Sequence, residues 1–106
     1  MKVSLQDHIG YKMCAVIEGV ICSHATTNIS YPKRKGAIIK DSRGIYLSMS
    51  KKFVLDYYSG LAEQEALLTL QFDEKSILTG DPKVLDGEIK VSRCKILDIE
   101  YMELDE

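Results

Sequence analysis

The sequence predicts an α+β fold, mostly antiparallel β-sheet with one short helix at about residues 50–59 packed on it. Two observations lead to this class. Several short runs rich in β-branched and aromatic side chains are bounded by turn signals, as is typical of antiparallel strands. Between two of these runs, one stretch changes from a two-residue repeat to a helical repeat. Because 106 residues are near the commonest domain size, we expect a single domain over 1–106.

The first predicted unit is a β-hairpin. Residues 1–8 are polar, and we expect them to be frayed or to form an edge. The runs 11–17 and 20–23 are separated by Glu18-Gly19, a two-residue turn that ends in glycine. Such a turn between two β-rich runs indicates antiparallel pairing of those runs.

A long loop and a second pair of strands follow. Residues 24–36 are mostly polar and contain a proline and a glycine, which predicts a long loop of the kind that is often functional. Residues 37–40 and 45–48 are predicted to form two short partner strands. The turn between them, 41–44, has Asp and Gly at its ends, as type I turns prefer.

The helix is predicted from the spacing of its apolar residues. One helical stripe is formed by Phe53, Val54, Tyr57 and Tyr58. A serine, Ser48 or Ser50, is available as the N-terminal cap, and Gly60 is suited to the end of the helix. A helix of roughly two and a half turns is too short to be stable alone, so it must pack on the sheet.

The C-terminal half predicts further strands. Leu68, Leu70 and Phe72 alternate with less apolar residues, which indicates a strand buried mostly on one face. Residues 73–78 are suited to one helical turn, and Asp86-Gly87 is a second hairpin signal. The apolar positions of the last strand change phase, which predicts a bulge or break near Arg93 or Cys94.

Charge is distributed unevenly along the chain. Residues 33–60 hold seven bases and two acids, a net of +5, whereas residues 61–106 hold twelve acids and five bases, a net of −7. The first 32 residues balance, so the total is −2. A dipolar chain of this kind favours steering toward a charged macromolecular partner, and its opposite charges also permit self-association into a homo-oligomer.

The acidic and basic groups give two candidate interaction surfaces. In the last predicted strand, acidic and apolar residues alternate and continue into an acidic tail, 103–106, which favours docking on a basic protein groove. Its candidate contact residues are Asp98, Glu100, Tyr101 and Glu103. The candidate anion-binding residues are Lys33, Arg34, Lys35, Lys40 and Arg43. Nucleic acid is the weaker partner for these bases because the sequence pI is about 5.7.

Several classes are disfavoured by the sequence. The three cysteines, Cys14, Cys22 and Cys94, include no CxxC pair, so we expect reduced structural thiols and no metal site. Residues 1–10 lack the apolar core of a signal peptide, and no apolar run is long enough to span a bilayer. We therefore expect a cytoplasmic protein without membrane contact and without a cofactor.

One segment supports a different function. Arg43–Gly60 contains a glycine, a short strand that carries Tyr46 and ends in Ser48, and a helix with late tyrosines. This segment resembles the central strand-to-helix unit of ADP-ribosyltransferase-like folds, in which such residues line the nicotinamide pocket. The resemblance implies that His24, Tyr46 and Glu88 act on or bind NAD or a nucleotide, as a transferase or as a non-catalytic relative.

The sequence thus leaves three functions to compare. The first is a small non-enzymatic protein-binding module, acting as a stoichiometric inhibitor of a host macromolecule. Small domains without a catalytic constellation are common among phage and mobile-element inhibitors of that kind. The second is the NAD-binding or transferase function that the resemblance implies, and the third is a nucleic-acid-binding accessory protein.

Overall fold

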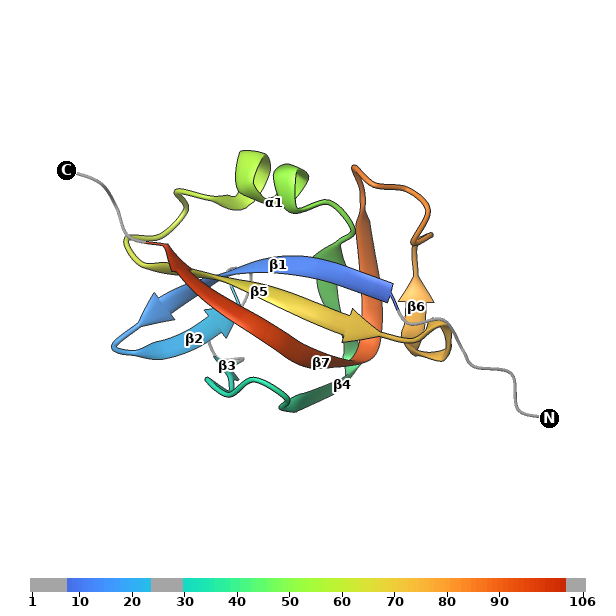
Figure 1. Cartoon of the computed structure of the whole chain (residues 1–106), viewed down its shortest axis with the longest axis horizontal. Helices are drawn as coiled ribbons and strands as arrows, with labels where there is room; N and C mark the ends of the chain where they lie inside the picture. The colour runs from blue at the N-terminus through green and yellow to red at the C-terminus, as the bar shows by residue number, and fades with distance from the viewer. Residues whose placement is uncertain (1–7, 24–29, 103–106) are drawn as a thin grey trace.

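The computed structural model describes residues 8–23 and 30–102, and its fold is mostly antiparallel β-sheet with one short α-helix (Figure 1). The class predicted from the sequence is therefore confirmed at this level. The elements in chain order are β1 (His8–Ile17), β2 (Val20–Ser23), β3 (Ser30–Tyr31), β4 (Ile38–Ser48), α1 (Lys51–Tyr58), β5 (Glu65–Phe72), the 3₁₀ turn η1 (Glu74–Ser76), β6 (Ile77–Thr79) and β7 (Glu88–Met102).

Four of the strands form a closed ring. β1 pairs with β5, β5 with β7, β7 with β4, and β4 returns to β1 through the pair Tyr11↔Ser48. On the edge of β1 that contacts β4, residues 14–17 pair with β2, and β2 pairs with β3. β6 pairs with β7. Every pairing in the described ranges is antiparallel. Ring closure protects strand edges that an open sheet would leave exposed.

The predicted hairpin at the N-terminal end is confirmed. Ile17 pairs with Val20 across Glu18-Gly19, and both turn residues have positive φ, 51° and 79°. A two-residue turn with this backbone matches the twist of the flanking strands, and glycine adopts it without steric cost. The predicted frayed segment was wrong at its last residue, because His8 begins β1. Residues 1–7 lie outside the described residues.

The predicted loop 24–36 contains a strand. Ser30 and Tyr31 form β3, which pairs with β2 through Cys22↔Ser30 and Ile21↔Tyr31. Tyr31 is buried, and it belongs to the apolar interior of the fold. Residues 24–29, which include His24, lie outside the described residues.

The predicted strand pair around the 41–44 turn is wrong. Both halves belong to one strand, β4, and both pair with β7, with a change of register between Lys40 and Ile45. Asp41 accepts a hydrogen bond from the backbone N–H of Arg43, and Gly44 has φ 107°, so these residues form a bulge. The turn signal was real, but it bends a strand rather than reversing the chain.

The helix forms where it was predicted. Ser50 is the N-cap and its hydroxyl accepts a hydrogen bond from the N–H of Phe53, and Gly60 follows the helix with φ 82°. The buried stripe differs from the prediction, because Val54 is buried and Tyr57 is 68% exposed. α1 lies against β1, with Val54 packed beside Met13 and Leu67 (Figure 1).

The connection from β5 to β7 matches the prediction in part. The predicted helical turn is η1, which Asp73 caps by accepting a hydrogen bond from the N–H of Ser76. β6 then pairs with β7 through Thr79↔Lys90. The link between them spans residues 80–87, so Asp86-Gly87 ends a longer connection instead of forming a tight hairpin turn.

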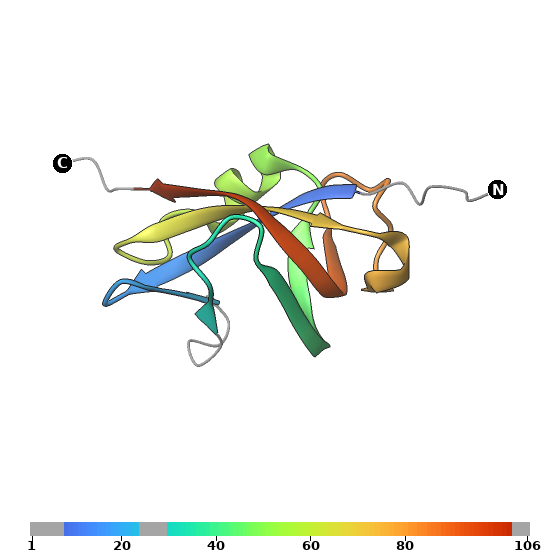
Figure 2. The ribbon, with the colours of Figure 1, turned by 60° about the horizontal axis from the view of Figure 1, so that its bottom comes forward.

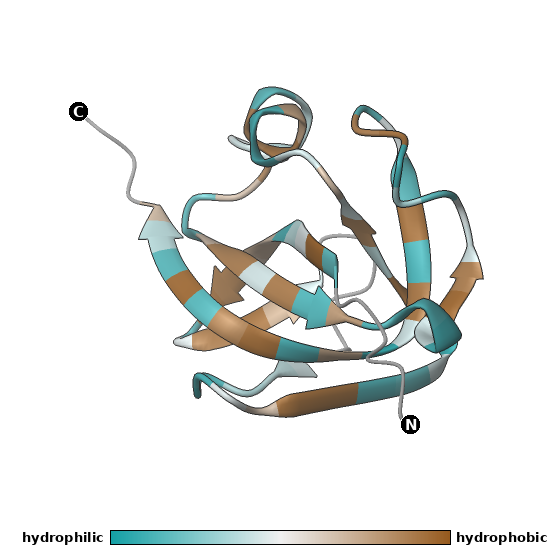
Figure 3. Ribbon diagram, turned by 45° about the vertical axis from the view of Figure 1, so that its right-hand side comes forward, coloured by the Kyte–Doolittle hydropathy of each residue, from teal (hydrophilic) through white to brown (hydrophobic). Residues whose placement is uncertain are grey.

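β7 confirms the predicted phase slip. Ile89 and Val91 are buried, and then Cys94 and Ile96 are buried, so the inward parity changes between residues 91 and 94. This slip lies opposite the bulge of β4. A second change of register, where Thr69 pairs with Asp98 and Leu70 with Ile96, was not predicted. Figure 3 shows the resulting interrupted alternation of apolar and polar residues along β7.

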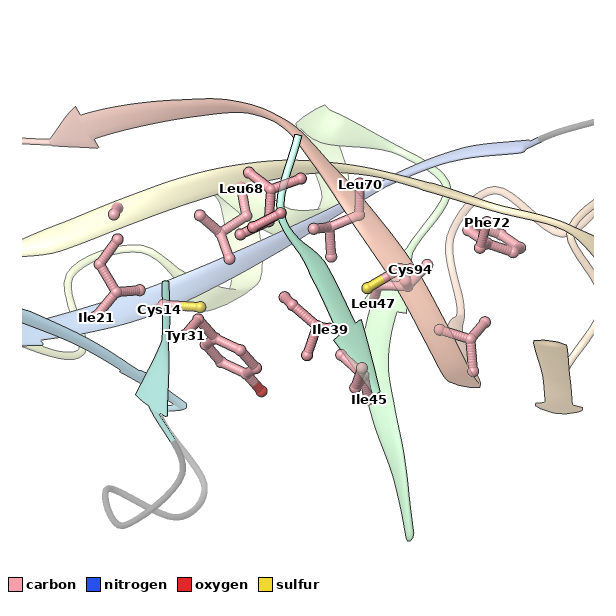
Figure 4. Packing of buried hydrophobic residues seen from close by; sticks show 14 of the residues in the cluster. Cys14, Ile21, Tyr31, Ile39, Ile45, Leu47, Leu68, Leu70, Phe72 and Cys94 are labelled. Carbon is pink, nitrogen blue, oxygen red and sulfur yellow. The ribbon is translucent and has the colours of Figure 1, made fainter. Parts of the chain in front are cut away.

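The interior has two parts. The larger cluster fills the ring with side chains from several strands, among them Tyr31 of β3, Ile39 of β4, Leu68 of β5 and Cys94 of β7 (Figure 4). The smaller cluster lies between α1 and the outer faces of β1 and β5. β1 and β5 therefore bury side chains on both faces, which explains their long apolar runs.

Candidate functional site

A cavity of about 310 Å³ lies where β1 and β4 separate. In the described ranges these strands share the pair Tyr11↔Ser48, beyond which β1 continues into the hairpin with β2 while β4 turns away (Figure 2). We call this region the seam. The residues that line the seam cavity are Tyr11, Lys12, Met13, Ser23, Tyr46, Leu47, Ser48, Val54, Tyr58 and Glu88.

Lys12 is the one basic residue in the lining of the seam cavity. Its Nζ donates a hydrogen bond to the carbonyl of Tyr46 at 2.9 Å, so the side chain bridges β1 and β4 beyond their backbone pairing. Burial lowers the pKa of the Lys12 ammonium, whereas nearby Cys14 and the Glu88 carboxylate partly oppose this effect. A half-buried ammonium is less well solvated than one in water, which favours interaction with an incoming anion.

Glu88 is the one acidic residue in the same lining. Its Oε2 accepts a hydrogen bond of 2.7 Å from the Tyr58 hydroxyl, which connects the start of β7 to α1. This hydrogen bond to the carboxylate is the main reason that the pKa of Tyr58 rises to about 12, so the phenol stays protonated at neutral pH. Glu88 is therefore held in position while it remains accessible to solvent.

Hydroxyls and rings complete the lining. Ser48 is buried and its hydroxyl donates to the Leu85 carbonyl at 3.4 Å. Ser23 is also buried, and Tyr46 is 47% exposed. The Nζ of Lys90 lies 5.4 Å from the centre of the Tyr46 ring, within the range of a cation–π interaction. A mostly apolar cavity with a few convergent polar groups is typical of sites for small organic ligands.

The structure brings together two of the three residues named by the ADP-ribosyltransferase resemblance. Tyr46 and Glu88 both line the seam cavity. His24 lies outside the described residues, although Ser23, directly before it in the chain, is part of the lining. Lys12 was missed by the sequence analysis, and Tyr58 was included only as one of the late tyrosines of the helix. A lysine within the apolar run of a predicted strand was the available signal for Lys12.

Two of the predicted acidic contact residues, Asp98 and Glu100, are engaged in ion pairs. Asp98 accepts the Lys35 ammonium at 3.2 Å, and Glu100 lies 3.5 Å from the Nζ of Lys51. Hydrogen bonding from Lys35 lowers the pKa of Asp98, and the backbone N–H of Ile99 adds to the effect. Tyr101 is 51% exposed, and Glu103 lies outside the described residues. The two oppositely charged regions of the sequence thus meet each other in the fold.

The predicted anion-binding residues do not form one uniform group. Lys35 pairs with Asp98, and Arg43 donates to Asp41, with its Nε 3.1 Å from Oδ1. The other three bases, Lys33, Arg34 and Lys40, make no ion pair within the described part of the chain. Two of the five positive charges are therefore already balanced by neighbouring carboxylates.

The cysteines are buried and reduced. Burial is the main cause that raises the pKa of Cys14 and of Cys94 to about 12, so both thiols are protonated at neutral pH. A protonated thiol is a weak nucleophile and a poor metal ligand. Among residues 8–23 and 30–102, no group of three His, Cys, Asp or Glu side chains is placed to hold a metal ion.

Comparison with known proteins adds no relative. No protein-family model, curated protein or solved structure matches this chain. In the described ranges, no helix is both long and apolar enough to cross a membrane.

Proposed function

We propose that this protein acts by stoichiometric binding and that the seam cavity holds part of the bound molecule. The observation that supports this function is the convergence of Lys12 from β1, Glu88 from β7 and Tyr58 from α1 on one mostly apolar cavity. Three elements distant in sequence contribute its polar groups, and each element is held in place by the core. Sites on rigid elements bind with less loss of conformational freedom.

The polar groups of the cavity are better suited to binding than to bond-breaking. Glu88 is hydrogen-bonded to a phenol that stays protonated, and the neighbouring buried thiols stay protonated as well. A carboxylate that accepts a hydrogen bond from a neutral donor is suited to the recognition of a cationic group. These features support a binding module.

The prediction that the bound molecule is a charged protein, and that the chain inhibits it, stays a prediction. A basic partner that docks on Asp98 and Glu100 would replace the ion pairs with Lys35 and Lys51. Such exchange of exposed ion pairs contributes little net affinity. For a charged partner the acidic strand is therefore expected to steer the approach, while the cavity contributes the contact that excludes water.

NAD binding is the second candidate function. It is favoured by the position of Tyr46 and Glu88 in one cavity, next to the residue that precedes His24. If the site also acts on NAD, incubation should release nicotinamide as water or a nucleophilic side chain takes up the ADP-ribosyl group, and Glu88→Gln should abolish this release. If the parent protein releases no nicotinamide and NAD shifts none of its backbone amide NMR signals, this candidate is eliminated.

The proposed binding function is tested by NMR titration of the whole chain. Benzoate, benzylamine and benzamide provide an anionic, a cationic and a neutral ring as probes. At least one of them should shift the backbone amide signals of Lys12, Tyr46 and Glu88, because all three residues line the cavity. Lys12→Met should remove or redistribute these shifts, since it deletes the ammonium and keeps the apolar stem.

Lys52→Met is the matched control for Lys12→Met. Lys52 lies exposed on α1, where it pairs with Asp56. The control variant should bind the probes as the parent does. If none of the probes perturbs the seam residues of the folded parent, or if Lys12→Met and Lys52→Met behave alike, the seam cavity is not the binding site.

A further inference from the structure

The two charges in the seam cavity are separated from each other. Lys12 and Glu88 both line it, yet they form no ion pair within 4.0 Å. They are close enough that the carboxylate influences the ammonium. A ligand that binds both groups needs such a gap, because a charge-assisted hydrogen bond of about 2.8 Å must fit on each side of it.

Both charged groups retain hydrogen-bonding capacity. An ammonium has three donors, and Lys12 uses one of them on the Tyr46 carbonyl. Glu88 accepts from Tyr58 through Oε2, and no partner of Oε1 occurs in the described part of the chain. A ligand can therefore bind Lys12 and Glu88 at the same time without breaking the hydrogen bonds that position them.

The lining of the seam cavity disfavours ligands that carry only positive or only negative charge. With one base and one acid, the lining has no formal net charge. A phosphate or dicarboxylate would be attracted by Lys12 and repelled by Glu88. An amine without an acid group would be attracted by Glu88 and repelled by Lys12. A molecule that carries one charge of each sign gives a partner both to the half-buried Lys12 ammonium and to the exposed Glu88 carboxylate.

The remaining lining determines what else the ligand carries. Met13, Leu47 and Val54 are buried apolar residues of the cavity wall, and the Tyr11 ring lies beside them. An apolar group seated there gains from the removal of its surface from water. The cavity volume of about 310 Å³ is at the lower end of the range for ligand sites, which suits a small molecule.

We propose that the seam cavity binds a small zwitterion with an apolar group, of the α-amino acid class, with its carboxylate on Lys12 and its ammonium on Glu88. This inference rests on the proposed binding function and specifies its ligand. The polar ends of the ligand bridge β1 and β7, and its apolar group lies toward α1.

Calorimetric and NMR titrations with three matched ligands test the zwitterion. L-Phenylalanine carries both charges, 2-phenylethylamine lacks the carboxylate, and 3-phenylpropionate lacks the amine. We expect L-phenylalanine to bind at least tenfold more tightly than either analogue. Lys12→Met should remove its advantage over 2-phenylethylamine, and Glu88→Gln should remove its advantage over 3-phenylpropionate. Lys52→Met should preserve both advantages.

Equal affinity for the three ligands would overturn the zwitterion inference. So would a higher affinity for L-phenylalanine than for both analogues that persists in Lys12→Met and in Glu88→Gln. If the benzoate, benzylamine or benzamide probes bind in the cavity but L-phenylalanine does not, the inference fails and the binding function stands. If no probe and no amino acid perturbs the seam residues, both fail together.

Discussion

The two edges of β1 differ in how they are paired. Along one edge, β1 pairs continuously with β5 from His8↔Phe72 to Ala15↔Glu65. Along the other, it pairs with β4 at Tyr11↔Ser48 and then with β2. The β5 edge is lined by fully buried Leu67, Leu68 and Leu70, whereas the seam cavity has Lys12, Glu88 and hydroxyls among its apolar residues.

This difference assigns separate roles to the two edges. Continuous pairing with apolar side chains on both faces stabilises the fold, since it buries the most apolar surface. The seam lacks such pairing, so polar groups and a cavity can occupy it without breaking a ladder of hydrogen bonds. Changes in the β5 edge should therefore reduce stability, and changes in the seam should reduce binding.

The largest effect is expected from Leu68→Ala, which tests the stabilising edge. Leu68 is completely buried in the ring interior, and its truncation leaves a cavity. The free energy of unfolding should fall by about 2–5 kcal/mol, measured by urea denaturation. Leu78→Ala is the control, because Leu78 is 45% exposed and its truncation should cost far less. Equal losses in the two variants would contradict the assignment of the core.

Gly10→Val tests the point at which the seam closes. Gly10 lies next to the Tyr11↔Ser48 pair, and a Cβ there would collide with the Leu47 side chain and approach the Ser48 carbonyl oxygen to 3.2 Å. We expect a loss of about 1–3 kcal/mol in the free energy of unfolding, together with weaker binding at the seam cavity. Ile9→Val is the control, because Ile9 is 36% exposed on the same strand. A stable Gly10→Val variant would show that β1 and β4 do not need this close approach.

Local sequence signals predicted the elements better than their partners. The Glu18-Gly19 turn identified a hairpin correctly because its two strands are adjacent in sequence. The Asp41–Gly44 signal indicated a bend equally well, but it did not reveal that both halves of β4 pair with the distant β7. A bulge and a hairpin turn use the same residue types, and only the long-range partner distinguishes them.

The site was less predictable than the fold for the same reason. Tyr46 and Glu88 were named through a resemblance, and their common cavity depends on the pairing of β4 with β7. Lys12 became part of the site because β1 returns to β4 across more than thirty residues of chain, as its hydrogen bond to Tyr46 shows. The apolar run around Lys12 is visible in the sequence, but it gives no information on which distant residues lie next to this lysine.

The smallest effect is expected at the surface. Asp98→Asn tests whether the exposed ion pair between Lys35 and Asp98 contributes to the stability of the fold. Lys35 and the Ile99 N–H lower the pKa of Asp98 in the folded chain relative to the unfolded chain. A group with a lowered folded pKa stabilises the fold above its unfolded pKa and loses that contribution as the pH falls through its folded pKa. The parent should therefore be slightly more stable than Asp98→Asn at neutral pH, and the difference should vanish on acidification. Added salt should also reduce it, because exposed pairs are screened. Urea denaturation of both proteins across pH and salt provides the comparison, and a difference that grows on acidification would contradict the Lys35–Asp98 pair.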